Sequence, residues 1–488
     1  MPWAPMRLLA YALGVISLAA AWWLHTTFGP VSMEQVLLHW RFAAAHDSVD
    51  ASLVNSFIEH VLVYPTLLAV LATWLDGRFL RRTDVHARAL PAVLRWPAHR
   101  LPWIAALAGL CTAASAVDAV EFAASFKHSN YFASHYLPPT SAALHPAPRT
   151  KNLVLVYGES LETTYADPRL FHRNLLQPLT DLGGVSFSRY QQMPGTGWTM
   201  AAIVSTQCGV PFKTVTLLDI ASQGEKLPHF LAGATCLSDL LHSAGYRNVF
   251  MGGASLDYSG KGTFLREHHY DEAYGRREWR HAGVSEDHIS GWGLHDDDLF
   301  ANARSKLREL HAAHRPFNLV VLTVDTHLPS GQLSAQCKAR GVQALDDIIG
   351  CSASQIADFV RFVHDEGFDE DTNVVVLGDH LSMRNTLWDR LQDAPNRHVF
   401  NAFFAKQPPV KNREDIVHFD LLPTLLDFIG IASDDGRLAL GTSGFAPAVT
   451  VPGDEDRRRM AEGLLLQSAA YADLWEPRAP TTQAPSAR

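Results

Sequence analysis

The chain has 488 residues, of which 47% are hydrophobic and only 19% are charged, and its net charge is −9. This length is enough to bury at least one large hydrophobic core. The negative balance argues against a nucleic-acid partner, because neutralising phosphates requires a basic surface that the chain as a whole lacks.

The N-terminal part contains three apolar runs, each near the roughly 20 residues of helix that cross a bilayer. They are Leu8–Phe28, Ser52–Leu75 and Leu101–Phe122. The third is the weakest, since Asp118 and Glu121 lie near its outer end. An arginine-rich segment, residues 76–100, separates the second run from the third and is expected in the cytoplasm. We therefore predict an uncleaved multi-pass anchor, residues 1–125, in a bacterial inner membrane, with everything after it in the periplasm.

Cysteine usage agrees with an oxidising compartment. Cys111 lies in an apolar run, and the other four form an even set without a Cys-x-x-Cys pair that would indicate zinc. Two disulfides between neighbours in the sequence, Cys208–Cys236 and Cys337–Cys351, are the favoured arrangement. The alternative is four buried free thiols, since cysteine often packs as a small hydrophobic residue.

From residue 151 onward, short apolar runs alternate with helix-like stretches. The expected strands are Asn152–Tyr157, Asn248–Met251, Phe317–Val324 and Asn373–Leu377. The expected helices include Leu237–Ala244, Asp298–His314 and Ser354–Asp365. Continuous apolar strands indicate a mostly parallel sheet covered on both faces, and the alternation predicts a doubly wound α/β domain with functional loops at the carboxyl ends of its strands.

These patterns divide the chain after the membrane anchor into three parts. Residues 126–150 are predicted to be a linker, and residues 151–432 a catalytic α/β domain. Residues 433–488 are predicted to be an extension without regular pattern. Its end, residues 476–488, is rich in Pro, Ala and Thr and is expected to be a disordered tail.

Acidic and imidazole side chains follow three of the predicted strands. Glu159 comes after the first, Asp325 and His327 after the third, and Asp379 and His380 after the fourth. Mixed oxygen and nitrogen ligands at one rim suit Mn²⁺, Mg²⁺ or Zn²⁺ acting as a Lewis acid on a phosphoryl oxygen. The alternative is structural: Glu159 could cap a helix, and the pair after the fourth strand could form a hydrogen-bonded turn.

Two hydroxyls, Thr196 and Thr199, follow a Pro-Gly turn just before a predicted helix. A hydroxyl placed there faces free backbone N–H groups that favour a bound anion, and coordination to a metal would make it a nucleophile at neutral pH. An N-cap threonine is the ordinary explanation of such a pattern.

Taken together, the motifs resemble those of the periplasmic phosphoglycerol transferases, which belong with lipoteichoic acid synthases in the sulfatase-like branch of the alkaline phosphatase superfamily. The resemblance covers about residues 150–430 and is greatest to the members that decorate osmoregulated periplasmic glucans. It rests on blocks in the family's order: Asn152–Glu162, Gln192–Thr199, Ser205–Pro211, Leu322–His327 and Gly378–Leu381. An alkaline phosphatase/sulfatase-like domain is the fold that this resemblance implies.

The resemblance also implies a single divalent metal, with Mn²⁺ expected and Mg²⁺ or Zn²⁺ as alternatives. Its ligands would be Glu159, Thr196, Asp379 and His380. Thr196 is favoured as the nucleophile because it follows the Pro-Gly turn, and Thr199 remains the alternative.

The same resemblance assigns residues to the substrate. His327 matches a histidine that contacts the substrate phosphate and transfers a proton. Lys261 stands where lipoteichoic acid synthases use an arginine against glycerol phosphate, and Asp325 and Thr199 are expected beside the substrate. Ser259, where those synthases have a tryptophan, counts against a lipoteichoic acid substrate.

The implied reaction moves sn-glycerol 1-phosphate from phosphatidylglycerol, a lipid of the inner membrane, to a periplasmic glucan through a phosphoglycerol-threonine intermediate, and it releases diacylglycerol. The closest rival is a phosphoethanolamine transferase acting on lipid A or glucan. A non-catalytic sensor or scaffold with this fold is the alternative from another class. Sulfate ester hydrolysis is not expected, because the segment Cys208-Gly-Val-Pro does not match the sulfatase signature.

Overall fold

The computed structural model describes residues 4–33, 35–37, 51–85, 92–140, 144–213, 229–447 and 453–477. Residues 86–91 of the arginine-rich segment and residues 478–488 of the predicted tail lie outside these ranges. The chain divides into two compact units. The first consists of Met1–Leu37 and Val49–Ala124, and the second of Leu38–Ser48 and Ser125–Arg488.

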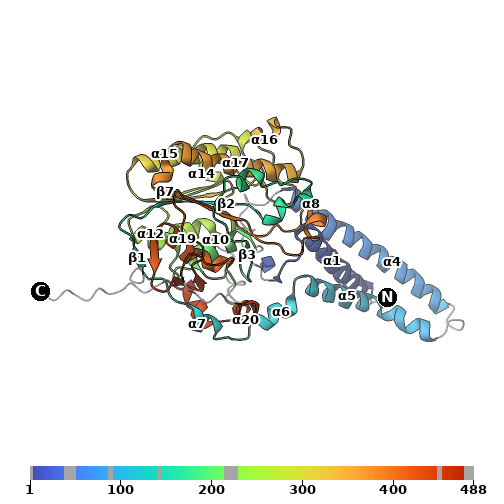
Figure 1. Ribbon diagram of the computed structural model, residues 1–488. Helices are drawn as coiled ribbons and strands as arrows, with labels where there is room; N and C mark the ends of the chain where they lie inside the picture. The colour runs from blue at the N-terminus through green and yellow to red at the C-terminus, as the bar shows by residue number, and fades with distance from the viewer. Residues whose placement is uncertain are drawn as a thin grey trace. The chain divides into compact units, whose positions relative to one another are not determined.

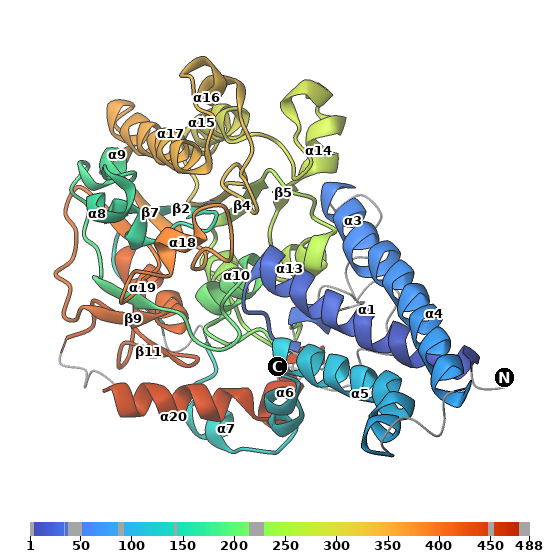
Figure 2. The ribbon, with the colours of Figure 1, turned by 90° about the vertical axis from the view of Figure 1, so that its right-hand side faces the viewer.

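The first unit is helical. Its described elements are α1 (Ala4–Phe28), α3 (Ala51–Phe57), the π-helical turn η1 (Ile58–Val63), α4 (Tyr64–Val85), α5 (Ala92–Ala116) and α6 (Ala119–Ser125). Helices α1, α4 and α5 lie side by side (Figure 2). Glycines allow the closest approach, because a Cβ at Gly109 of α5 would lie 2.2 Å from the carbonyl oxygen of Gly14 of α1. Such small-residue contacts are typical of helices that pack within a bilayer.

Two helical stretches, Ala4–Phe28 and Leu53–Leu80, are long and apolar enough to cross a membrane. They correspond to the first two predicted runs. The third predicted run is not one straight helix: Arg100–Ala116 and Ala119–Ser125 meet at an angle of 61°. The break falls where Asp118 takes a left-handed backbone conformation with φ of 48°. Three spans are present only if this bent pair crosses together.

The second unit is built on a six-stranded sheet with the order β5-β4-β6-β2-β7-β8. Five strands are parallel, and β8 runs antiparallel to β7 at one edge. Their bounds are β5 (Glu272–Tyr274), β4 (Arg247–Gly252), β6 (Phe317–Leu322), β2 (Asn152–Gly158), β7 (Thr372–Gly378) and β8 (Asn401–Phe404). The predicted mostly parallel sheet is confirmed, although the short edge strands β5 and β8 were not expected from the sequence.

Helices cover both faces of this sheet (Figure 1). One face carries α15 (Asp296–Ala312) and α17 (Leu345–Asp365), and the other carries α10 (Thr199–Cys208), α12 (Leu237–Ser243) and α19 (Leu421–Phe428). Strand β2 divides its side chains between two cores, with Val154 and Val156 on the α15 and α17 side and Leu155 and Tyr157 on the other. This burial on both faces explains why the strand is continuously apolar.

The remaining elements of this unit are short. The helices are α7 (Tyr131–His135), α8 (Pro168–Phe171), α9 (Gln177–Thr180), α13 (Lys261–Glu267), α14 (Arg276–His281), α16 (Ala335–Ala339), α18 (Trp388–Leu391), α20 (Asp454–Leu465) and α21 (Ala469–Ala472). The strands are β1 (Leu144–Pro146), β3 (Arg189–Gln191), β9 (Asp415–Val417), β10 (Ile431–Ser433), β11 (Arg437–Leu438) and β12 (Gly441–Thr442).

The segment after residue 432 is more ordered than its sequence pattern suggested, since α20 and α21 lie within it. Tertiary hydrogen bonds hold these helices. The Lys213 ammonium donates to the carbonyl of Leu464 at 2.7 Å, and the Tyr471 hydroxyl donates to the carbonyl of Pro211 at 2.9 Å. Short helices of this kind depend on packing more than on their own periodicity, which is why the pattern did not predict them.

Both predicted disulfides, Cys208–Cys236 and Cys337–Cys351, are formed. The first joins the end of α10 to the residue before α12, and the second joins α16 to α17. The alternative of four free thiols is therefore wrong.

Candidate active site

The carboxyl ends of strands β2 and β7 bring three polar side chains together. The two strands pair in parallel with Gly158 opposite Gly378, so the residues that follow them are neighbours. Glu159, Asp379 and His380 are all buried, and their candidate ligand atoms lie within 4.8 Å of one another. His380 Nε2 lies 3.7 Å from Glu159 Oε1 and 3.4 Å from Asp379 Oδ2.

This cluster has the donor set of a divalent metal site. His380 Nδ1 lies 2.8 Å from the carbonyl oxygen of Leu381, which can only accept, so Nδ1 carries the proton and Nε2 is left as a ligand. Asp379 Oδ1 accepts hydrogen bonds from the backbone of Ser160 and His380. The other oxygen, Asp379 Oδ2, is buried without a hydrogen-bond partner among the described residues. Two carboxylates and one imidazole that converge around an unpartnered buried oxygen fit a hard or borderline cation.

The charges of the cluster also suit a divalent cation. Burial, and then the charge of Glu159, raises the pKa of Asp379 to about 7. Burial opposes ionisation of Glu159 too, but His327 and His380 hold its pKa below the ordinary value. Burial lowers the pKa of Lys261, the first residue of α13, to about 8, although both carboxylates act in the opposite direction. A positive charge placed between the carboxylates would stabilise both in the ionised form.

Two hydroxyls donate to the Glu159 carboxylate: Ser160 Oγ, from a buried residue, at 2.8 Å to Oε1, and that of Thr199. Thr199 Oγ1 donates to Glu159 Oε2 at 3.2 Å, and Thr199 is partly exposed at the first position of α10. Thr196 is fully buried, and its hydroxyl is engaged with the backbone of Met193, donating to the carbonyl at 2.8 Å and accepting from the N–H at 3.0 Å. Thr196 was expected among the metal ligands, but in the structure its hydroxyl contacts Met193 instead. The turn at Gly195, where φ is 75°, directs Thr196 toward Met193.

His327 lies near the cluster, on the loop after β6. Its Nδ1 lies 3.1 Å from the carbonyl oxygen of Leu328, so Nδ1 donates and Nε2 remains available for a proton transfer. His327 also contacts a ring that the sequence did not point to: the indole of Trp292 lies over the imidazole, with 3.8 Å between ring centroids. The segment Ser290-Gly-Trp-Gly was the only signal, an aromatic residue between two glycines.

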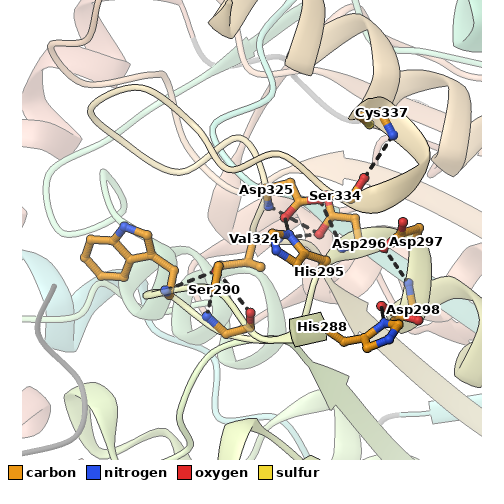
Figure 3. Close-up of polar contacts among 12 residues, drawn as sticks. His288, Ser290, His295, Asp296, Asp297, Asp298, Val324, Asp325, Ser334 and Cys337 are labelled. Atoms are coloured by element: carbon orange, nitrogen blue, oxygen red, sulfur yellow. Dashed lines mark hydrogen bonds and ion pairs between the residues drawn. The ribbon is translucent and has the colours of Figure 1, made fainter. Parts of the chain in front are cut away.

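Asp325, expected beside the substrate, is occupied elsewhere. It is 1% exposed, and its carboxylate accepts from His295 Nδ1 at 2.7 Å and from the backbone N–H of Asp296 at 3.1 Å (Figure 3). Its role in the structure is to hold the start of α15 against the loop that carries His327. The prediction that Asp325 contacts the substrate is corrected accordingly, because its carboxylate is hydrogen-bonded to His295, a residue that the sequence analysis did not consider.

A buried ion pair ties together the two loops that carry the ligands. Arg397 donates to both oxygens of Glu162, through Nε at 2.9 Å and through a second nitrogen. Arg397 also donates to the carbonyl of Ser382 at 2.6 Å, and the backbone N–H of Ser382 donates to Glu162 at 2.9 Å. Glu162 follows Glu159 by three residues, and Ser382 follows His380 by two, so this pair fixes the spacing of the cluster.

Comparison with known proteins agrees with the arrangement of this unit. The family model described as Sulfatase matches residues 151–431. The chain belongs to the sulfatase family. The solved structure of a protein in the alkaline phosphatase superfamily, from Vibrio parahaemolyticus, is similar to this chain with a TM-score of 0.48 and 20% sequence identity. The similarity covers 68% of this chain and 79% of that one.

Relatives at higher identity are found among bacterial transferases. The protein named phosphoglycerol transferase I in Shigella flexneri is 34% identical over 325 residues, which are 64% of this chain and 41% of that protein. The protein of the same name in Escherichia coli strain K12 is 34% identical over 329 residues, with the same shares. The chain thus spans less than half the length of these relatives.

Proposed function

We propose that this chain is a membrane-anchored phosphoglycerol transferase, which moves sn-glycerol 1-phosphate from phosphatidylglycerol to a periplasmic glucan. The observation that carries the proposal is the hydroxyl of Thr199, hydrogen-bonded to the Glu159 carboxylate within a buried group of metal-ligand residues. Relatives named phosphoglycerol transferase I support the choice of glycerol phosphate as the transferred group.

Glu159, Asp379 and His380 would hold one divalent cation, which we propose is Mn²⁺, and Thr199 stands beside it. Such a cation, when bound, supplies positive charge that lowers the pKa of a nearby hydroxyl and offsets negative charge on a phosphoryl oxygen. Thr199 is proposed as the nucleophile in place of Thr196, because its hydroxyl is partly exposed and contacts the cluster. The first turn of α10 also presents backbone N–H groups that favour a bound anion.

The transfer has two displacements at one site. The Thr199 oxygen attacks the phosphorus of the lipid after its proton has passed to solvent, and the bond from phosphorus to the glyceride oxygen breaks. His327 Nε2 protonates that oxygen, so that neutral diacylglycerol leaves. A sugar hydroxyl then attacks the phosphoglycerol-threonine, giving its proton to His327, and Thr199 is regenerated. The buried ammonium of Lys261 stabilises the negative phosphoryl oxygens in both steps.

We propose that the α/β unit works in the periplasm and that the apolar helices anchor it in the inner membrane. The arginine-rich segment between the second and third apolar runs supports a cytoplasmic position for residues 76–100. The two disulfides support an oxidising compartment for the α/β unit. An anchor of this kind keeps the active site near the membrane that contains the donor lipid. The retained set of Glu159, Thr199, Asp379 and His380 argues against a non-catalytic scaffold.

Mass spectrometry of a covalent adduct tests this proposal directly. Detergent-purified full-length protein is incubated with phosphatidylglycerol and Mn²⁺, and the intact mass and the peptides around α10 are measured. The expected result is a glycerol-phosphate mass on Thr199, absent from Thr199→Val and present in the matched control Thr196→Val. An adduct lost only in Thr196→Val would restore the other threonine as nucleophile. An ethanolamine-phosphate mass, formed only with phosphatidylethanolamine, would replace the proposal with the rival transferase.

A further inference from the structure

Trp292 lies over His327 on the tip of a short hairpin. Residues Ile289 and Leu294 form the antiparallel bridge that closes this hairpin. The indole and imidazole rings are 3.8 Å apart between centroids and inclined by only 30°, so they meet nearly face to face. The indole N–H has no hydrogen-bond partner among the described residues. The contact of Trp292 with His327 is therefore made through the ring face.

The hairpin tip is held rigidly by its own backbone. The Ser290 hydroxyl oxygen accepts from the N–H of Trp292 and from that of Gly293, each at 3.2 Å. Gly293 also bridges Ala254, just beyond strand β4. Its φ is 154°, and a Cβ there would lie 2.1 Å from the carbonyl oxygen of Gly253, so only glycine permits this approach. The backbone next to the indole is thus tied to the segment just after β4, and this contact places the Trp292 side chain.

A second set of contacts pins the far end of the hairpin to the loop that carries His327. His295 Nδ1 and the Asp325 carboxylate are 2.7 Å apart, and Asp296 Oδ1 accepts from the N–H of Val324 at 2.7 Å (Figure 3). Val324 and Asp325 directly precede the turn that contains His327. Buried hydrogen bonds therefore join the segment after the hairpin to the segment just before His327.

We propose that Trp292 is a positioning residue for His327 and that, together with the Leu328 carbonyl, it aims Nε2 at the oxygen of the leaving group. This inference rests on the proposed function, in which His327 Nε2 gives its proton to the glyceride oxygen as the bond between that oxygen and phosphorus breaks. The Leu328 carbonyl fixes which nitrogen donates, and the indole face fixes the plane of the ring. General acids depend on such placement, because the proton must lie within hydrogen-bond reach of its acceptor.

The role of Trp292 is tested by comparing reaction rates with two donors that differ in their leaving group. Release of diacylglycerol from phosphatidylglycerol needs a proton, whereas p-nitrophenolate leaves from the p-nitrophenyl diester of glycerol phosphate without one. Trp292→Leu is expected to lower the single-turnover rate of adduct formation from the lipid by roughly 10- to 100-fold, a part of the roughly 10²- to 10⁴-fold that a general acid supplies, with a much smaller loss on the nitrophenyl diester. The single-turnover rate is measured because His327 also takes part in the second displacement, which both donors share. The KM for the lipid is expected to change little. Trp292→Phe, which keeps a ring face, is expected to recover most of the lost rate.

Three further results decide between the explanations. His327→Gln, measured beside the tryptophan variants, is expected to discriminate between the two donors at least as strongly as Trp292→Leu. If His327→Gln discriminates and Trp292→Leu slows both donors equally, Trp292 is only structural and the inference is overturned. If His327→Gln itself slows both donors equally, the acid role in the proposed function fails instead. Should Trp292→Leu not fold, Ser290→Ala loosens the hairpin tip with the ring intact, and equal loss on both donors would overturn the inference in the same way.

Discussion

Replacing Arg397 by methionine should expose how strongly the ligand loops depend on one ion pair. Glu162 is 0% exposed, and Arg397 supplies two of its hydrogen bonds, leaving only the N–H of Ser382 in the variant. Removing one partner of a buried pair costs about 3–5 kcal/mol, because the remaining charge has no compensation. Methionine keeps the approximate volume, so the loss is electrostatic rather than a cavity.

The effect should reach the metal site as well as stability. Glu162 and Ser382 lie on the loops that carry Glu159 and His380, and loss of such supporting contacts weakens metal binding by roughly 10- to 100-fold. Urea unfolding of the full-length protein in detergent measures the stability, and Mn²⁺ titration of the folded protein measures the affinity. The double variant Glu162→Leu with Arg397→Met should recover much of the stability, because no charge remains buried. If Arg397→Met alone lowers the free energy of unfolding by less than about 1 kcal/mol, which is the range of an exposed ion pair, the reasoning is refuted.

Three other outcomes follow from the geometry. Transfer activity should fall as pH rises through about 8, where buried Lys261 loses its proton, and Lys261→Arg should move this fall to higher pH in a pH–rate profile. Replacing both Cys337 and Cys351 by serine should lower the free energy of unfolding by about 3 kcal/mol, since the disulfide closes a loop with a sequence separation of 14. Denaturant titration without reductant measures this loss, and an unchanged unfolding midpoint would contradict it. Thr196→Val should cost about 1–3 kcal/mol of stability while adduct formation persists, because its hydroxyl serves only the Met193 backbone.

Much of this protein can be predicted from its sequence. The apolar runs that end in Gly-Glu and Gly-Asp-His predicted two parallel strands with their ligands at one rim, because strand burial and the carboxyl-end rule are local and directional. That the two strands are neighbours is a finding of the structure. Glu159, Asp379 and His380 meet as expected. The spacing of the cysteines likewise predicted both disulfides.

Other features were decided only by tertiary structure. The sequence analysis favoured Thr196 over Thr199, but the direction of their hydroxyls depends on the turn at Gly195 and on where α10 begins. Asp325 was expected beside the substrate, yet His295, 30 residues away, forms a hydrogen bond with its carboxylate. Trp292 reaches His327 only because the hairpin that carries it contacts Ala254, just after β4. A sequence pattern carries the positions of strands and their burial. The order of strands in the sheet and the direction of a side chain depend on contacts between segments that are distant along the chain, and these exist only in the folded molecule.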